Sequence, residues 1–118
     1  MGMLGQVLLS SLPEREVDRI LKRNPLKPIT KKSLKTRENL NRRLEKTREQ
    51  GFSLEKGEVI DGVAGVAAPI RNHLGKVIAA VGTRFIGSST GKEREKQLIT
   101  DVCETARRIS MDLGYQLK

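Results

Sequence analysis

A predicted β-hairpin over residues 61–86 constrains the fold of this chain more than any other segment. Two runs rich in β-branched and small apolar residues, 63–71 and 76–86, flank four residues with turn chemistry, 72–75. If the turn is symmetric, residues whose numbers sum to 147 lie opposite each other. The hairpin therefore predicts an antiparallel sheet at the centre of the fold.

The two faces of this hairpin differ, because side chains alternate between the faces of a strand. One face carries the apolar side chains of an ordinary core surface: Val66, Ala68, Ile70, Val77, Ala79, Val81 and Phe85. On the other face the predicted register pairs small residues and one arginine: Gly65 with Gly82, Ala67 with Ala80, and Val63 with Arg84. That face is nearly bare, which indicates either a closely docked helix or a bed for a ligand. A register slip of one residue would remove the bare patch.

Helices are predicted before the hairpin. Residues 3–8 follow helical spacing, and Ser11 with Glu14 resembles a capping box for a second helix that ends at Asn24-Pro25. Residues 36–50 form a third helix, capped by a threonine, stopped by a glycine and carrying only a thin apolar stripe. A short strand then starts at residues 52–54.

A long helix is predicted after the hairpin. Residues 90–93 resemble a second capping box, and Gly114 terminates the helix. Apolar residues recur along it at intervals of three or four: Leu98, Val102, Ala106, Ile109 and Leu113. This order of elements predicts an α+β fold, in which an antiparallel sheet has helices packed mainly on one face. With 118 residues, the chain is expected to form a single domain, residues 1–118.

The net charge of +9 is concentrated in one segment. Residues 22–48 hold eleven basic and two acidic residues, so this segment accounts for the whole net charge. Such a segment is typical either of a solvated helix with a flexible loop or of a binding surface for a polyanion. Because no aromatic residue lies among these cations, stacking of single-stranded bases is not expected.

Catalytic chemistry is sparse in this sequence. Cys103 has no second cysteine to pair with and falls in the apolar stripe of the last helix, and His73 falls in the predicted turn. Residues 87–92, GSSTGK, have three residues between the glycines where a phosphate-binding loop needs four. Three carboxylates before the hairpin are typical of an exposed loop: Glu55, Glu58 and Asp61. We therefore expect no enzyme, no metal and no cofactor, but a binding or regulatory module.

The sequence contains no signal for membranes or export. No apolar run reaches the length of a membrane span, and the N-terminus lacks the basic and apolar regions of a signal peptide. We therefore expect no membrane partner and a cytoplasmic protein.

Four stretches of the chain form an ordered set. They are GQVLL with LPE (5–9 and 12–14), TREQGF (47–52), Gly62 with AAPI (67–70), and GKVIAAV (75–81). Together they resemble the C-terminal part of the effector-binding domain of IclR-type bacterial transcriptional regulators, over nearly the whole chain.

This resemblance implies a GAF-like fold and a small-molecule effector, often a carboxylate or an aromatic metabolite. It also implies a homodimer or homotetramer, and operator DNA bound through a winged helix-turn-helix domain absent from this chain. The opening strands of the effector domain are likewise expected to be missing, which leaves the fold incomplete at its N-terminus. An exposed sheet edge of this kind favours pairing with another chain.

The resemblance places an effector site on six residues: Met3, Leu4, Glu55, Gly65, Gly82 and Arg84. Met3 and Leu4 fall at a pair that contacts the effector through its backbone, and Glu55 falls at the carboxylate of the site. The other three replace thiol or hydroxyl positions of the family members that sense small acids. These replacements disfavour glyoxylate- or pyruvate-like ligands and indicate an organic acid with an apolar body, whose acidic group meets Arg84.

We therefore expect the regulatory, effector-binding domain of a transcriptional regulator, which signals occupancy by a shift in population between arrangements of its oligomer. The alternative is a basic nucleic-acid-binding module that acts through residues 22–48. That alternative predicts affinity for any duplex that falls steeply as the salt concentration rises.

Overall fold

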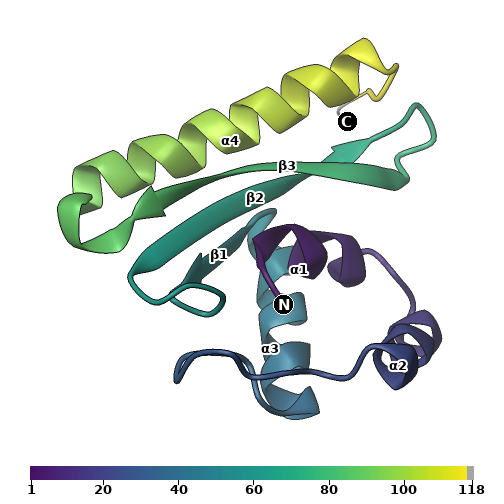
Figure 1. Ribbon diagram of the computed structural model, residues 1–118. Coiled ribbons are helices and arrows are strands. Elements are labelled where there is room, and N and C mark those ends of the chain that lie inside the picture. Colours follow the sequence, from purple (N-terminus) through teal and green to yellow (C-terminus); the bar gives the residue numbers. More distant parts are fainter. Residues whose placement is uncertain (117–118) are drawn as a thin grey trace.

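The computed structural model describes residues 1–116, in which four α-helices surround a three-stranded antiparallel sheet (Figure 1). The elements follow in the order α1 (Met3–Ser10), α2 (Glu14–Arg23), α3 (Arg37–Gln50), β1 (Ser53–Lys56), β2 (Val63–Arg71), β3 (Val77–Ile86), the 3₁₀ turn η1 (Gly87–Ser89) and α4 (Lys92–Asp112). The strands lie in the order β1-β2-β3. Figure 1 shows α1, α2 and α3 gathered on one side of the sheet and α4 along the other. The predicted α+β fold, with helices mainly on one face, is confirmed.

The hairpin turn forms as predicted, but the strand register differs from the prediction. Asn72 Oδ1 accepts hydrogen bonds from the backbone N–H groups of Leu74 (2.9 Å) and Lys76 (3.1 Å), as asparagine commonly does in turns. Lys76 thus belongs to the turn and not to β3. A β-bulge between Ile70 and Arg71 inserts one further residue into β3.

These two extra residues shift the predicted pairing by two. Opposite residues sum to 149 through most of the hairpin, so the predicted partners are wrong: Gly65 pairs with Arg84, Ala67 with Gly82, and Val63 with Ile86. Because the shift is even, each side chain beyond the bulge keeps its predicted face. Val77 lies at the bulge itself. It lines a cavity together with Ser10 and Pro69 on the α1 side of the sheet. The prediction that Val77 lies on the α4 face is therefore wrong.

The helix ends follow the prediction at α3, at Asn24 after α2 and at Gly114 after α4, where φ is +94°. Thr36 Oγ1 accepts a hydrogen bond from Asn39 N (3.1 Å), and Gly51 ends the helix with φ of +85°. The capping box predicted at Ser11 is wrong, because its hydroxyl donates to Leu8 O (2.7 Å) and closes α1. The box predicted at residues 90–93 is also wrong, because Gly91 occupies the N-cap of α4 without a side-chain bond.

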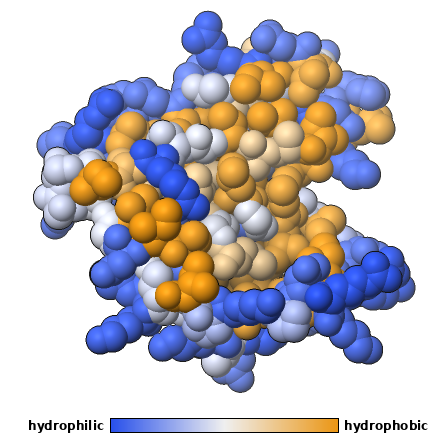
Figure 2. Space-filling model, viewed as in Figure 1, coloured by the Kyte–Doolittle hydropathy of each residue, from blue (hydrophilic) through white to orange (hydrophobic). Residues whose placement is uncertain are grey.

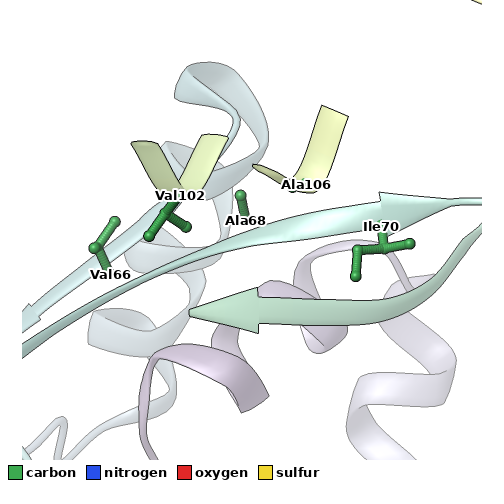
Figure 3. Packing of buried hydrophobic residues seen from close by; sticks show 5 residues of the cluster. All are labelled: Val66, Ala68, Ile70, Val102 and Ala106. Atoms are coloured by element: carbon green, nitrogen blue, oxygen red, sulfur yellow. The ribbon is translucent and has the colours of Figure 1, made fainter. Parts of the chain in front are cut away.

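The α4 face of the sheet forms the largest apolar contact. Val66, Ala68 and Ile70 of β2 pack against Val102 and Ala106 of α4 (Figure 3). Cys103 is half-buried beside them, as expected of a small apolar side chain. The helical periodicity of α4 and the alternation of β2 therefore predicted this interface.

Two smaller clusters lie on the other side of the sheet. Met3 and Val7 of α1 pack on Ala67, while a separate cluster joins α1, α2 and α3 through Leu9, Val17, Leu40 and Leu44. The thin apolar stripe of α3 is sufficient to anchor this helix, because both of its leucines, Leu40 and Leu44, are buried. Within residues 1–116, no helix combines the length and apolar character that a membrane span requires.

Candidate functional site

The bare patch of the hairpin is covered by α1. Met3 is almost fully buried, and its Sδ atom lies only 2.7 Å from where a β-carbon on Gly65 would be. The space above Gly65 is therefore filled by a flexible methionine side chain and is not an empty hollow. The docked helix, one of the two explanations for the patch, is the one observed.

Gly82 has a different reason to lack a side chain. A β-carbon at this position would lie 2.5 Å from Val66 O and 2.9 Å from Ala67 Cβ, so the close approach of β2 requires glycine. Gly82 is nevertheless exposed, as are Leu4 of α1 and Arg84 of β3. Of the six predicted site residues, these three face solvent and Met3, Glu55 and Gly65 lie buried beneath.

An ion pair joins the two charged residues of the predicted site. Arg84 Nη1 donates to Glu55 Oε1 at 2.7 Å; the Glu55 side chain is fully buried, whereas the Arg84 side chain is 36% exposed. Glu55 Oε2 accepts a further bond from the backbone N–H of Glu58 (3.0 Å). A buried carboxylate needs such partners, since an unpaired charge in the interior is costly. Glu55 therefore fixes the guanidinium of Arg84 on the α1 side of the sheet.

The described residues offer no second acceptor to Arg84, so its remaining donors stay available. The guanidinium presents five N–H donors in a planar fork, which suits a carboxylate or phosphate group. Gly65, the cross-strand partner of Arg84, contributes no side chain of its own, and Arg84 Nη2 lies beside Gly2, 3.0 Å from where a β-carbon on that residue would be. This arrangement can bind an anion from solvent without breaking the pair with Glu55.

A buried polar network next to this pair was not predicted from the sequence. Arg43 of α3 binds the Glu58 carboxylate through Nη2 (2.5 Å) and Nη1 (3.0 Å), and Nη1 also donates to Gln6 Oε1 (3.0 Å). Gln6 Nε2 donates to Glu58 Oε1 (3.1 Å), and the Ser53 hydroxyl donates to Gln6 Oε1. The network joins α1, α3 and β1 to the loop after β1.

Two signals in the sequence point to this network. Gln6 lies on the inward face of α1 with Met3 and Val7, and Arg43 adjoins the apolar stripe of α3. A polar residue on an apolar helix face needs a buried partner. The expectation that the loop carboxylates are exposed is wrong for Glu55 and Glu58, whereas Asp61 is exposed as expected.

The basic segment 22–48 is partly neutralised by the protein itself. Arg37 Nη1 lies 2.6 Å from Asp18 Oδ1, Arg48 Nη1 donates to Ser10 O (3.2 Å), and Arg43 belongs to the buried network. The two ion pairs, with Asp18 and Glu58, reduce the charge that the segment can offer to a polyanion, and the bond to Ser10 O occupies one donor of Arg48. Within the described chain, no group of three or more acidic, histidine or cysteine side chains has the arrangement of a metal site.

Cys103 is the one thiol of the chain and has no catalytic surroundings. Burial raises the pKa of its thiol, and its side chain packs against the apolar cluster between β2 and α4. A reactive cysteine needs the opposite, a lowered pKa beside a cationic group. His73 lies exposed in the hairpin turn, where the sequence placed it.

Known proteins resemble this chain in both sequence and fold. The family model described as bacterial transcriptional regulator IclR C-terminal matches residues 1–111. The HTH-type transcriptional regulator XynR of Escherichia coli K12 is 32% identical over 95% of the chain, which covers 44% of XynR. KdgR of the same strain is 30% identical over 95% of the chain and 43% of KdgR.

A solved structure of one of these relatives has the same fold. The C-terminal domain of E. coli KdgR superposes with a TM-score of 0.89 at 30% identity, over 97% of this chain and 70% of that one. The chain thus spans less than half the length of the curated relatives named above. These relatives are transcriptional regulators and not enzymes, in agreement with the function class predicted from the sequence. The chain belongs to the IclR family of bacterial transcriptional regulators and corresponds to part of the family's C-terminal, effector-binding region.

Proposed function

We propose that this chain binds a small organic acid on the exposed surface formed by Leu4, Gly82 and Arg84. The observation that carries the proposal is the guanidinium of Arg84, which a fully buried carboxylate holds in place while its side chain stays 36% exposed and its other donors have no acceptor among the described residues. A donor group oriented before binding loses little conformational freedom when the ligand arrives. Met3, Glu55 and Gly65 form the layer beneath the ligand.

The surroundings of Arg84 favour a ligand with an apolar body. On the face shown in Figure 2, hydrophobic residues spread over the middle of the molecule between hydrophilic borders. Leu4 and Leu8 of α1 are 43% and 40% exposed, and Ile86, two residues after Arg84 in β3, is also exposed. Apolar ligand surface placed on such residues stabilises a complex by roughly 25 cal/mol per Å² removed from water.

In the whole regulator, we propose that ligand occupancy is read by a DNA-binding domain through a homodimer or homotetramer. A ligand that binds one arrangement of the oligomer more tightly shifts the population toward it. Coupling energies of this kind are typically about 1–3 kcal/mol. The unpaired edge of β3 is a candidate contact between copies, because an exposed strand edge presents free backbone donors and acceptors.

The test is a thermal-shift screen of the full chain with aromatic and aliphatic acids, followed by calorimetry on the acids that raise the melting temperature. Arg84→Lys keeps a positive charge next to Glu55 but loses the planar fork. We expect it to weaken the binding of a selected acid by roughly 1.5–3 kcal/mol, the range for a hydrogen bond to a charged group. Arg107→Ala is the control, because Arg107 lies exposed on α4 and pairs with Glu104 there. Equal affinity for the acid in Arg84→Lys and the unchanged protein would refute the proposal.

A further inference from the structure

The α4 side of the sheet contains a cavity that is separate from the Arg84 surface. It measures about 410 Å³ and lies where the ends of β1, β2 and β3 meet the start of α4. Ala64 and Phe85 form its floor; they pair across β2 and β3 and share the α4 face. Arg84 follows the opposite parity along β3 and lies on the other face of the sheet. Pockets that hold small molecules commonly measure about 300–1,000 Å³.

Three glycines border this cavity, and one of them leaves open space. Gly57, Gly62 and Gly87 all line it, and a β-carbon on Gly62 would meet no atom within 4 Å. The bare patch differs, because a β-carbon on Gly65 or on Gly82 would have a neighbouring atom within 3 Å. Space left by glycine therefore exists in this molecule, but at the α4 end of the hairpin.

Three lysines from distant segments reach this cavity: Lys32, Lys56 and Lys92. One carboxylate, Glu95, also lines the cavity, and it is held by Lys56 Nζ at 2.9 Å. Among the described residues, Lys32 and Lys92 have no acidic partner within 4 Å. The lining therefore carries an excess of positive charge above an apolar floor.

Two hydrogen bonds from the neighbours of Lys32, one partly and one fully buried, hold its segment at the cavity. Thr30 Oγ1 donates to Gly57 O at 2.6 Å, and Ser33 Oγ donates to Glu58 O at 2.6 Å. These bonds tie the loop before α3 to the loop after β1, with Lys32 between them. The Lys32 side chain consequently lies against Gly57, its Cδ atom 3.2 Å from where a β-carbon would be. The tie fixes the backbone on both sides of Lys32 and so places this exposed lysine at the wall of the cavity.

We propose that this cavity is a second ligand site, for a small acid whose carboxylate or phosphate group lies between Lys32 and Lys92 and whose flat apolar body lies on Phe85. An ammonium group is a compact point charge that suits either anion. The apolar floor supplies the part of the affinity that exposed charge pairs alone do not give. The site goes beyond the proposed effector surface and is independent of Arg84.

The experiment uses the full chain labelled with ¹⁵N and three probes that share a benzene ring: benzoate, phenyl phosphate and neutral benzyl alcohol. We expect the two acids to shift the amide signals of Gly57, Gly62 and Gly87, and benzyl alcohol to bind about tenfold more weakly or not at all. The tighter of the two acids identifies the anion that the site prefers. If neither acid shifts these signals, or if benzyl alcohol binds as well as benzoate, the proposal is wrong.

A matched pair of double variants separates site-specific charge from net charge. Lys32→Gln with Lys92→Gln removes the two ammonium groups of the cavity, whereas Lys31→Gln with Lys96→Gln removes two exposed lysines outside it. We expect about a tenfold loss of affinity in the first pair and little change in the second. Equal losses in both pairs would overturn the proposal.

The Arg84→Lys variant distinguishes this site from the effector surface. It should leave the shifts at Gly57, Gly62 and Gly87 unchanged, because Arg84 lies on the other face of the sheet. Shifts confined to the surroundings of Arg84, and lost in that variant, would support the effector surface and overturn the second site.

Discussion

On the α4 face of the sheet the buried contacts are apolar except for the Ser110 hydroxyl, whereas on the α1 face a small apolar contact lies beside buried carboxylates and an amide. The apolar interface depends on area and shape, so it tolerates exchanges of similar volume. The polar layer depends on each partner being present, because a buried charge or amide without a partner is costly. The two faces should therefore respond to substitution in different ways.

The largest expected effect is that of Arg43→Ala, because this substitution removes the main partner of the buried Glu58 carboxylate. The Glu58 side chain is 6% exposed and that of Arg43 21%, so Arg43→Ala should lower the free energy of unfolding by about 3–5 kcal/mol. Urea unfolding measures this loss. Adding Glu58→Gln should recover part of it, because no buried charge is then left.

Arg42→Ala is the control for this prediction, since Arg42 lies exposed on the same helix. It should change the free energy of unfolding by less than about 0.5 kcal/mol. Similar losses in Arg43→Ala and Arg42→Ala would show that the network contributes little, and the contrast between the two faces would fail.

A smaller effect is expected at the two glycines of the α1 face. A β-carbon on Gly82 would meet the backbone oxygen of Val66, whereas one on Gly65 would meet the sulfur of a flexible methionine. Gly82→Ala should therefore destabilise the fold by about 1–3 kcal/mol, the range for overpacking, and Gly65→Ala by less. Thermal unfolding of both variants measures the order, and a larger loss in Gly65→Ala would contradict the account of the patch.

The smallest effect is expected at Cys103 on the α4 face. Burial raises the pKa of its thiol, so at pH 8 less thiolate is present than in an unfolded chain. Alkylation by iodoacetamide should therefore be slower in the native protein than in urea, and it should accelerate as the pH rises. Native and unfolded rates that agree after correction for the effect of urea on the reagent would mean that the thiol is freely exposed.

The fold could be predicted in large part because its signals are local. Alternation in β2, the period of α4, the turn at Asn72 and the cap at Thr36 each lie within a few neighbouring residues. The predicted strand register was wrong for a local reason too. Lys76 belongs to the turn, and a bulge between Ile70 and Arg71 adds one more residue to β3. Neither a longer turn nor a bulge changes the pattern of apolar residues enough to be visible in advance.

The candidate site was predicted only in part. The resemblance to IclR regulators named both members of the Glu55–Arg84 pair, which lie 29 positions apart. The filling of the patch by Met3 and the burial of Glu58 depend on where α1 and α3 dock. The hydrogen bond between Gln6 and Glu58 joins residues 52 positions apart, and neither local segment indicates which residue the other end will be.

The sequence by itself determined the sheet, its apolar face and the family, because periodic side chains and ordered motifs are properties of the chain. Only the tertiary structure decided which glycines leave space. Neighbouring atoms occupy the space beside Gly65 and Gly82, whereas the space beside Gly62 belongs to a cavity. The physical reason is that the absence of a side chain permits close approach or emptiness alike, and the packing of distant segments selects between them.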